Sequence, residues 1–269
     1  MNIKEIKEVL ANNPNEEILQ LLQEDTRAGV QKLVASFYKH REEELREKAR
    51  FQGMLQYEKK YWQQGIEYVA GCDEAGRGPL AGPLVVAAVI LPQDIFISGL
   101  NDSKKLSPKK RATLYDEVCA KALSITVNIV GHYDIDRVNI YEATKIAMKQ
   151  CLENLTHIPK VALIDAMPLE LNNIEGVSLI HGDSLSASIA AASIIAKVTR
   201  DRIMVELDTK FPQYGFAGHK GYGSEKHMQA IAQYGPCMWH RRSFEPIKGL
   251  NKNNILGKGV EENILQKIK

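Results

Sequence analysis

The chain has 269 residues, of which 44% are hydrophobic and 25% are charged, and its formal net charge is +2. This length suits one large domain, or one domain with an extension, and the composition excludes global disorder. The slightly basic balance neither requires nor excludes a nucleic-acid partner, so any basic binding surface must be local.

The cysteines and the hydropathy pattern indicate a cytoplasmic protein. No two cysteines form a C-x-x-C pair, which argues against a zinc knuckle or a redox dithiol. Their scatter fits buried, reduced thiols. Residues 1–10 lack an apolar signal core, and no run is long enough to cross a membrane. We expect a cytoplasmic monomer with no membrane partner. The cysteines are Cys72, Cys119, Cys151 and Cys237.

Residues 1–64 predict a helical extension, because they are poor in glycine and rich in Glu, Lys, Gln and Leu. Apolar residues recur at helical spacing from Ile3 to Leu10 and again after the break at Asn12–Asn15. A third, longer helix is expected to start after Asp25 or Thr26 and to include the charged run that ends at Arg50. The charges of that run balance, which favours a solvated helical face over a dedicated nucleic-acid patch.

From residue 65 onward, strand and helix signals alternate, which predicts an α/β domain over residues 65–248. We expect a mixed sheet of five strands with helices on its faces. Residues 249–269 are expected to form a solvated tail. The expected strands are Ile66–Cys72, Leu84–Leu91, Ser124–Val130, Val161–Ile164 and Val177–Ile180, and the expected helices are Pro108–Val118, Tyr141–Leu155 and Ser184–Leu207.

The stretch Gly71–Pro79 carries two adjacent carboxylates and then an arginine between two glycines. Neighbouring residues of a strand point to opposite faces, so Asp73 and Glu74 meet at one site only if the strand ends or kinks there. Glycines at positions 76 and 78 would supply that freedom. An acidic hairpin turn is the simpler interpretation. We favour a functional site, because clustered acids beside backbone donors suit metal and phosphate chemistry.

Four acids are expected at the ends of strands: Asp73, Glu74, Asp165 and Asp183. In open α/β sheets the ligand crevice lies at the carboxyl ends of the strands. Taken singly, Asp183 could be a helix N-cap, Asp165 a turn residue, and Glu74 a partner of Arg77. Taken together, four oxygen donors without His or Cys at ligand spacing suit two divalent cations, Mn²⁺ or Mg²⁺. The matching chemistry is two-metal hydrolysis of a phosphodiester bond.

At these residues the chain resembles the ribonuclease HII family, with the helical extension of some bacterial members. The resemblance covers residues 65–248. The motifs that carry it are Gly71–Pro79, Asn101–Lys104, Leu163–Asp165, His181–Ser184, Ala196–Val198, Gly218–Gly223 and His240–Phe244.

The resemblance implies an RNase H-like fold and a metal-dependent endoribonuclease. Its substrates would be RNA–DNA hybrids and duplex DNA that contains single ribonucleotides, cut on the 5′ side to leave 3′-hydroxyl and 5′-phosphate ends. The four acids would be the catalytic metal ligands. The implied substrate-binding residues are Gly76, Arg77, Gly78, Lys104 and Tyr222.

The residue pattern alone leaves the roles of Lys104 and Tyr222 open, since a loop lysine is commonly solvated and a loop aromatic need not stack on a substrate. The histidines near the C-terminus are expected to be structural or to contact phosphate. Two alternatives to the main hypothesis are the sister ribonuclease HIII, which the helical N-terminus and the Gly76–Gly78 triplet disfavour, and a nucleic-acid-binding scaffold without chemistry.

Overall fold

A computed structural model describes residues 1–250; residues 251–269, which make up most of the expected tail, lie outside the described part. The chain divides into two compact units, Met1–Gly53 and Met54–Lys269. The division expected from the sequence, at residues 64 and 65, stays a prediction. No helix within residues 1–250 has both the length and the apolar character that a membrane span needs.

The N-terminal unit is built from three helices, α1 (Ile3–Ala11), α2 (Glu16–Glu24) and α3 (Ala28–Met54), of which only the last residue falls in the second unit. Asn2 and Glu5 form a capping box on α1, and the Asn15 side chain caps α2, so both short helices begin at a satisfied N-terminus. Their apolar faces make a small core of their own. Its buried members are Ile6, Leu10, Leu19, Leu22, Val30 and Val34.

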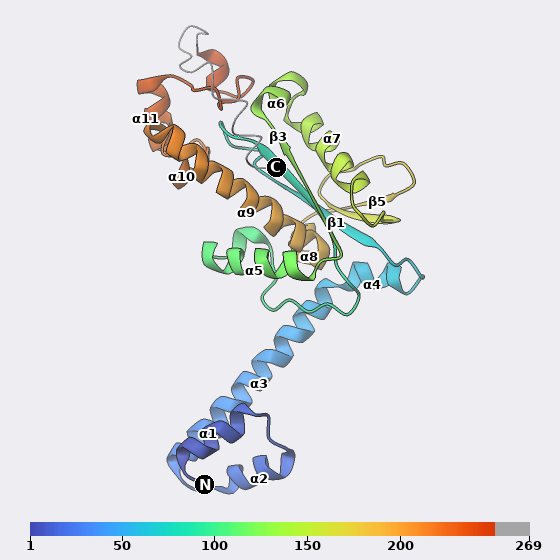
Figure 1. Ribbon diagram of the computed structural model, residues 1–269, viewed down its shortest axis with the longest axis vertical. Coiled ribbons are helices and arrows are strands. Elements are labelled where there is room, and N and C mark those ends of the chain that lie inside the picture. Colours follow the sequence, from blue (N-terminus) through green and yellow to red (C-terminus); the bar gives the residue numbers. More distant parts are fainter. Residues whose placement is uncertain (251–269) are drawn as a thin grey trace. The chain divides into compact units, whose positions relative to one another are not determined.

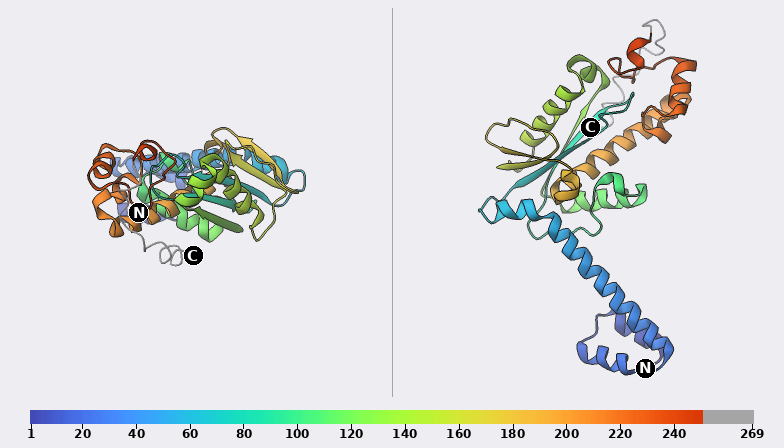
Figure 2. Two further views of the ribbon diagram at one scale, coloured as in Figure 1. Left: turned by 90° about the horizontal axis from the view of Figure 1, so that it is seen from above. Right: turned by 180° about the vertical axis from the view of Figure 1, so that it is seen from behind.

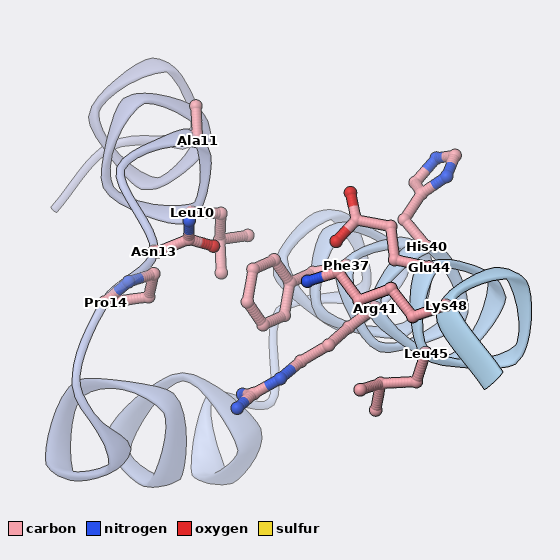
Figure 3. A pocket seen from close by; sticks show the side chains of 10 residues that line it. All are labelled: Leu10, Ala11, Asn13, Pro14, Phe37, His40, Arg41, Glu44, Leu45 and Lys48. Carbon is pink, nitrogen blue, oxygen red and sulfur yellow. The ribbon is translucent and has the colours of Figure 1, made fainter. Parts of the chain in front are cut away.

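A pocket lies between the α1–α2 connection and one face of α3, and Figure 3 shows the side chains that line it. Phe37 and Leu10 form its apolar side, and Arg41, Glu44 and Lys48 carry charges of both signs. The mixed charge agrees with the balanced helical face expected from the sequence.

The second unit holds the sheet and the remaining helices (Figure 1). Short 3₁₀ turns lie at Ser103–Lys105, Pro212–Tyr214 and Ile247–Gly249. The elements in chain order are α4 (Gln56–Trp62), β1 (Val69–Ala75), β2 (Leu84–Ile90), α5 (Pro108–Lys121), β3 (Ser124–Val130), α6 (His132–Val138), α7 (Ile140–Glu153), β4 (Val161–Asp165), β5 (Glu175–Leu179), α8 (Gly182–Leu185), α9 (Ala187–Lys210), α10 (Phe216–His219) and α11 (Glu225–Tyr234).

The sheet has five strands in the order β3-β2-β1-β4-β5. The pairs β1–β2 and β2–β3 are antiparallel, whereas β1–β4 and β4–β5 are parallel. The mixed five-stranded α/β sheet predicted from the sequence is confirmed. Because β1, β4 and β5 run the same way, their carboxyl ends meet at one edge.

Helices cover both faces of the sheet, with α7 and α9 on opposite sides in Figures 1 and 2. On the α7 side, Cys72, Val86 and Ile164 pack with Met148 and Cys151 in the main core. On the other side, Val69, Val161 and Leu163 pack with Ile189 of α9 and Tyr61 of α4. Buried strands with apolar residues on both faces follow from this double cover.

Two expectations about the elements need correction. The expected helix Ser184–Leu207 is two helices, because Ser186 adopts an extended conformation between α8 and α9. The first strand neither ends nor kinks at its acids: β1 runs from Val69 through both of them to Ala75 and is paired with β2 from Ala70 to Ala75. Antiparallel hydrogen bonding with β2 is what extends the strand beyond Cys72.

Helix α9 lies unusually close to β1, and Gly71 permits it. A Cβ atom at Gly71 would lie 2.0 Å from the carbonyl carbon of Ser188. The three atoms nearest to this Cβ belong to the backbone of Ser188 and Ile189, so no side chain can move away to make room. The run Ala187–Ala192, rich in Ala and Ser, brings only small side chains to this contact.

We therefore expect Gly71→Ala to destabilise the protein by about 3 kcal/mol or more, at the upper end of the cost of overpacking a core. The measurement is thermal or denaturant unfolding. Gly53→Ala is the matched control, because a Cβ there meets nothing within 4 Å, and it should be neutral or stabilise its helix. An unchanged unfolding midpoint for Gly71→Ala would show that α9 and β1 are not so close.

Candidate active site

Three carboxylates meet at the carboxyl edge of the parallel strands. Cys72 of β1 pairs with Ile164 of β4, so the next residues on each strand, Asp73 and Asp165, are neighbours. Asp183 arrives from α8, just beyond β5. Each of these three aspartates places a carboxylate oxygen within 4.8 Å of the other two. The expected meeting of acids from separate strands is thus what the structure shows for three of the four.

Glu74 lies outside this triplet. Because β1 continues through it, its side chain leaves the strand on the face opposite to Asp73. One oxygen, Oε1, is 3.5 Å from Nη1 of Arg77, and the other, Oε2, is buried without a hydrogen-bond partner among the described residues. From the sequence we expected all four acids to meet at one point. The alternation of side chains along β1 instead leaves Glu74 next to the triplet but not within it.

Burial and mutual repulsion make these acids hard to ionise together. Burial raises the pKa of Asp73, and the nearby charges of Glu74 and Asp165 raise it further. Burial likewise raises the pKa of Glu74, against the pull of Arg77. Burial, together with Asp102 and Asp165, raises the pKa of Asp183 to about 6. Backbone N–H groups stabilise two of the carboxylates directly: Gly182 donates to Asp165 Oδ1 at 2.7 Å, and Glu74 donates to Asp73 Oδ1 at 2.6 Å.

The Lys104 loop lies beside Asp183. Asp102 accepts a hydrogen bond from the Lys104 N–H at 2.8 Å and so starts the 3₁₀ turn, and Arg111 of α5 donates to the carbonyls of Ser103 and Leu106. The Lys104 ammonium is 3.8 Å from Asp183 Oδ2, yet its side chain is 78% exposed. Burial opposes the charged form, but Asp73 and Asp183 raise the pKa of Lys104 overall. The loop thus presents an exposed cation at the rim of the acidic cluster.

A buried arginine holds the Gly76–Gly78 loop from behind. Arg241 donates to the carbonyls of Gly76 at 2.6 Å, Arg77 at 2.8 Å and Gly82 at 3.2 Å. In a trans peptide the C=O and the following N–H point in opposite directions. Two carbonyls turned toward Arg241 therefore turn the N–H groups of Arg77 and Gly78 away from it.

A second buried arginine joins this loop to the one that carries Tyr222. Arg200 of α9 donates to Pro83 O at 2.9 Å, Ala81 O at 3.2 Å and Lys220 O at 2.9 Å. The guanidinium carbon is 5.9 Å from the centre of the Tyr222 ring. Tyr222 is 47% exposed, and its ring edge would lie 3.8 Å from a Cβ on Gly78. The structure thus brings Tyr222 beside the Gly-rich loop.

Sequence reasoning missed the function of both buried arginines. Burial lowers the pKa of Arg241 to about 9 and of Arg200 to about 10, and both stay protonated at neutral pH. Arg241 lay within a recognised motif, but nothing in the sequence marks a buried arginine that binds carbonyls instead of acids.

The buried histidines His227 and His240 are structural, which is one of the two roles expected from the sequence. The Cys237 N–H donates to His240 Nδ1 at 3.0 Å, so the ring proton of His240 is on Nε2. That proton is donated to His227 Nε2 at 3.1 Å, and His227 Nδ1–H donates to the Tyr222 carbonyl at 2.9 Å. Each of the three hydrogen bonds between Cys237 and Tyr222 thus uses one proton, and both imidazole rings are neutral in this arrangement.

The donor set fits divalent cations. It offers only carboxylate oxygens, which suit Mg²⁺ or Mn²⁺. Oε2 of Glu74 is buried without a hydrogen-bond partner among the described residues, and burial and neighbouring acids raise the pKa of Asp73. A bound cation would offset both of these costs. Asp73, Asp165 and Asp183 would hold such an ion, with Glu74 at its side.

Solved structures with a similar fold include ribonucleases H. The ribonuclease H2 of Pyrococcus horikoshii OT3 superposes with a TM-score of 0.59 at 28% identity, over 68% of this chain and 96% of that one. The ribonuclease HII of Archaeoglobus fulgidus, solved with PCNA, superposes with a TM-score of 0.55 at 26% identity, over 73% and 99%. The fold and the acidic edge thus define an RNase H-like enzyme.

The chain belongs to the ribonuclease HII family. The family model for ribonuclease HII matches residues 70–247, and that for the ribonuclease HII N-terminal domain matches residues 2–62. The ribonuclease HII of Bacillus cereus strain B4264 is 53% identical over 252 residues, which are 93% of this chain and 98% of that protein. This membership makes the chain an endonuclease for RNA–DNA hybrids and excludes the sister family and the inactive scaffold as its identity.

The buried histidine pair should make stability fall with acid. Burial lowers the pKa of His227 to about 4, and burial with the charge of His227 lowers that of His240 to about 3. In the unfolded chain both histidines have a pKa near 6.5. Below about pH 6.5 the unfolded state therefore binds more protons than the folded state, and acid favours unfolding. Each histidine should then cost about 1.4 kcal/mol per pH unit between pH 6 and 4.

The measurement is the unfolding free energy between pH 7 and 4.5. His227→Gln should flatten the fall by about the share of one histidine. His40→Gln, which removes an exposed histidine of α3, is the control and should leave the slope unchanged. Parallel curves for wild type and His227→Gln would contradict the expectation.

Proposed function

We propose that this enzyme incises duplex DNA on the 5′ side of a single embedded ribonucleotide, as well as cutting RNA–DNA hybrids, and leaves 3′-hydroxyl and 5′-phosphate ends. We further propose two divalent cations as cofactors, Mn²⁺ or Mg²⁺, held by Asp73, Glu74, Asp165 and Asp183. The observation that carries the proposal is the triplet of aspartate oxygens within 4.8 Å, beside a buried Glu74 oxygen that has no hydrogen-bond partner within residues 1–250.

When bound, the ions would lower the pKa of the attacking water and stabilise the leaving oxygen. The chain's own groups position the substrate. Lys104, an exposed cation 3.8 Å from Asp183, can neutralise a phosphate that lies against the acidic cluster. Arg77, whose side chain is partly exposed beside Glu74, can hold a neighbouring phosphate with its planar fork.

The Gly76–Gly78 loop and Tyr222 are proposed to read the junction between RNA and DNA. The 2′-hydroxyl distinguishes the two sugars and can be contacted only by groups at close range. The N–H groups of Arg77 and Gly78 point away from Arg241, and the missing side chain of Gly78 leaves room beside the Tyr222 ring. Backbone donors for a hydroxyl and a ring for the adjoining sugar thus lie side by side.

We also propose that residues 1–64 are a helical extension and that residues 65–248 form the catalytic domain. The family matches over residues 2–62 and 70–247 support this division. The compactness of the chain supports an earlier boundary, after Gly53, which leaves α4 with the catalytic unit.

The experiment uses a labelled DNA duplex with one ribonucleotide, beside an all-DNA duplex and a continuous RNA–DNA hybrid, with and without Mg²⁺ or Mn²⁺. A metal-dependent nick on the 5′ side of the ribonucleotide is expected. Cleavage of the continuous hybrid alone would refute the proposed ribonucleotide incision.

Asp73→Asn should lower the cleavage rate at least about 1,000-fold, since it removes a charge from the centre of the reaction. It should leave the fold intact, because Asn keeps the oxygen that accepts from the Glu74 N–H. The rise in melting temperature that Mn²⁺ gives the wild type should also shrink. Asp116→Asn, on the exposed face of α5, is the charge-matched control. A near-normal rate in Asp73→Asn would overturn the ligand assignment.

Arg77→Ala should lower the preference for ribonucleotide-containing over all-DNA duplex by about tenfold, or about 1.4 kcal/mol. Affinity for all-DNA duplex should change much less, because one phosphate contact is a small part of duplex binding. The measurement is the ratio of the two dissociation constants in Ca²⁺. Arg137→Ala, an exposed arginine of α6, is the control. Equal losses on both duplexes would argue against a junction-specific role for Arg77.

A further inference from the structure

Helix α4 places a carboxylate in the interior of the catalytic unit. Glu58 is 0% exposed. Its Oε1 accepts two hydrogen bonds, from Ser186 Oγ at 2.6 Å and from the Ser188 N–H at 2.9 Å. Burial raises the pKa of Glu58, so placing an acid here costs stability. At the start of α9, Ser186 Oγ accepts from the Ile189 N–H and Glu58 accepts from the Ser188 N–H, so the two side chains cap this helix together.

The two residues that Glu58 contacts are Ser186, at the junction between α8 and α9, and Ser188, the second residue of α9. Ser186 is the C-cap of α8, where its N–H donates to Gly182 O at 2.8 Å, and the N-cap of α9, where its Oγ accepts from Ile189 N at 3.2 Å. The direction in which α8 leaves α9 is therefore decided at this residue. Helix α8 has only four residues, and one of them is Asp183.

The start of α9 also contacts β1. The Ser188 backbone lies against Gly71, two residues before Asp73 on the same strand. Helix α4 also packs on this side of the sheet, where Tyr61 meets Val69, Val161 and Leu163. The start of α9 thus contacts both Glu58 and the strand that carries Asp73.

We propose that Glu58 is a positioning residue of the active site: its hydrogen bonds to Ser186 and Ser188 hold the α8–α9 junction so that the Asp183 carboxylate reaches Asp73 and Asp165. The inference rests on the proposed function of the acidic cluster. It makes the last helix of the N-terminal extension a working part of the catalytic centre, without any contact to the substrate.

The test compares Glu58→Ala, Glu58→Gln and Tyr61→Phe in the full chain. Tyr61→Phe is the matched control, because it removes one hydrogen bond of the same helix, from Tyr61 OH to Glu175 Oε1 at 2.9 Å, away from the α8–α9 junction. Four quantities are measured: the melting temperature, the Mn²⁺ affinity without substrate by electron paramagnetic resonance, and kcat and KM on the ribonucleotide-containing duplex.

Glu58→Ala should weaken Mn²⁺ binding by about tenfold or more, the order expected when a group that orients a ligand is lost. It should lower kcat to a similar degree while KM stays within about twofold, because substrate contacts are untouched. Glu58→Gln keeps an accepting oxygen and should restore most of both. Tyr61→Phe should lower only the melting temperature. If Glu58→Ala fails to fold, Ser186→Ala removes the donor to the same carboxylate and should show the same pattern.

The inference is overturned if Glu58→Ala loses stability yet matches Tyr61→Phe in Mn²⁺ affinity and kcat, since Glu58 would then be structural only. It is also overturned if Gln is no better than Ala. A wild type that does not nick the ribonucleotide-containing duplex would refute the proposed function instead, and the Mn²⁺ affinities would still decide the role of Glu58.

Discussion

The repulsion among buried carboxylates is the constraint on which this structure depends. Asp73, Asp165 and Asp183 hold oxygens within 4.8 Å of one another, and burial raises the pKa of Asp73 and Asp183. Lys104 and the Gly182 N–H offset only part of that repulsion. Groups that repel stay together only on a rigid support, and the parallel pairing of β1 with β4 and the close packing of α9 on β1 provide one.

The same rigidity continues into the loops around the site, where buried arginines bind backbone carbonyls. The two glycines of the loop, Gly76 and Gly78, therefore have different structural reasons. Gly76 has a φ of +97°, and a Cβ there would lie 2.1 Å from Arg200 Nε, so the scaffold itself requires glycine. At Gly78 a Cβ would meet only the Tyr222 ring at 3.8 Å. Gly78 leaves space in front of the loop, and the proposed contact of this loop with a substrate depends on that space.

The sequence could predict the sheet and the place of the acids, because buried apolar runs and acids at strand ends are local signals. It could not place Glu74, since the length of β1 is decided by pairing with β2, which lies beyond the local pattern. The break at Ser186 was hidden for a related reason: Ala and Ser continue a helical composition across it, and the hydrogen bonds that stabilise the break come from Glu58, 128 residues earlier. Buried Arg200 and Arg241 carry no sequence mark, because their partners are carbonyl groups that every residue has.

Helix α4 shows how two ways of dividing a chain can both hold. By family it falls within the match over residues 2–62, with α1 to α3. By packing it belongs to the sheet, because Tyr61 joins the core of β1 and β4, whereas α1 to α3 share a separate core. Helix α4 thus lies within the family-defined N-terminal domain and at the same time packs in the interior of the second unit. Glu58 gives that membership a chemical consequence, since its carboxylate binds the junction from which Asp183 projects. Removal of the whole family-defined extension would therefore remove a support of the active site, whereas removal of the first 53 residues would leave that support in place.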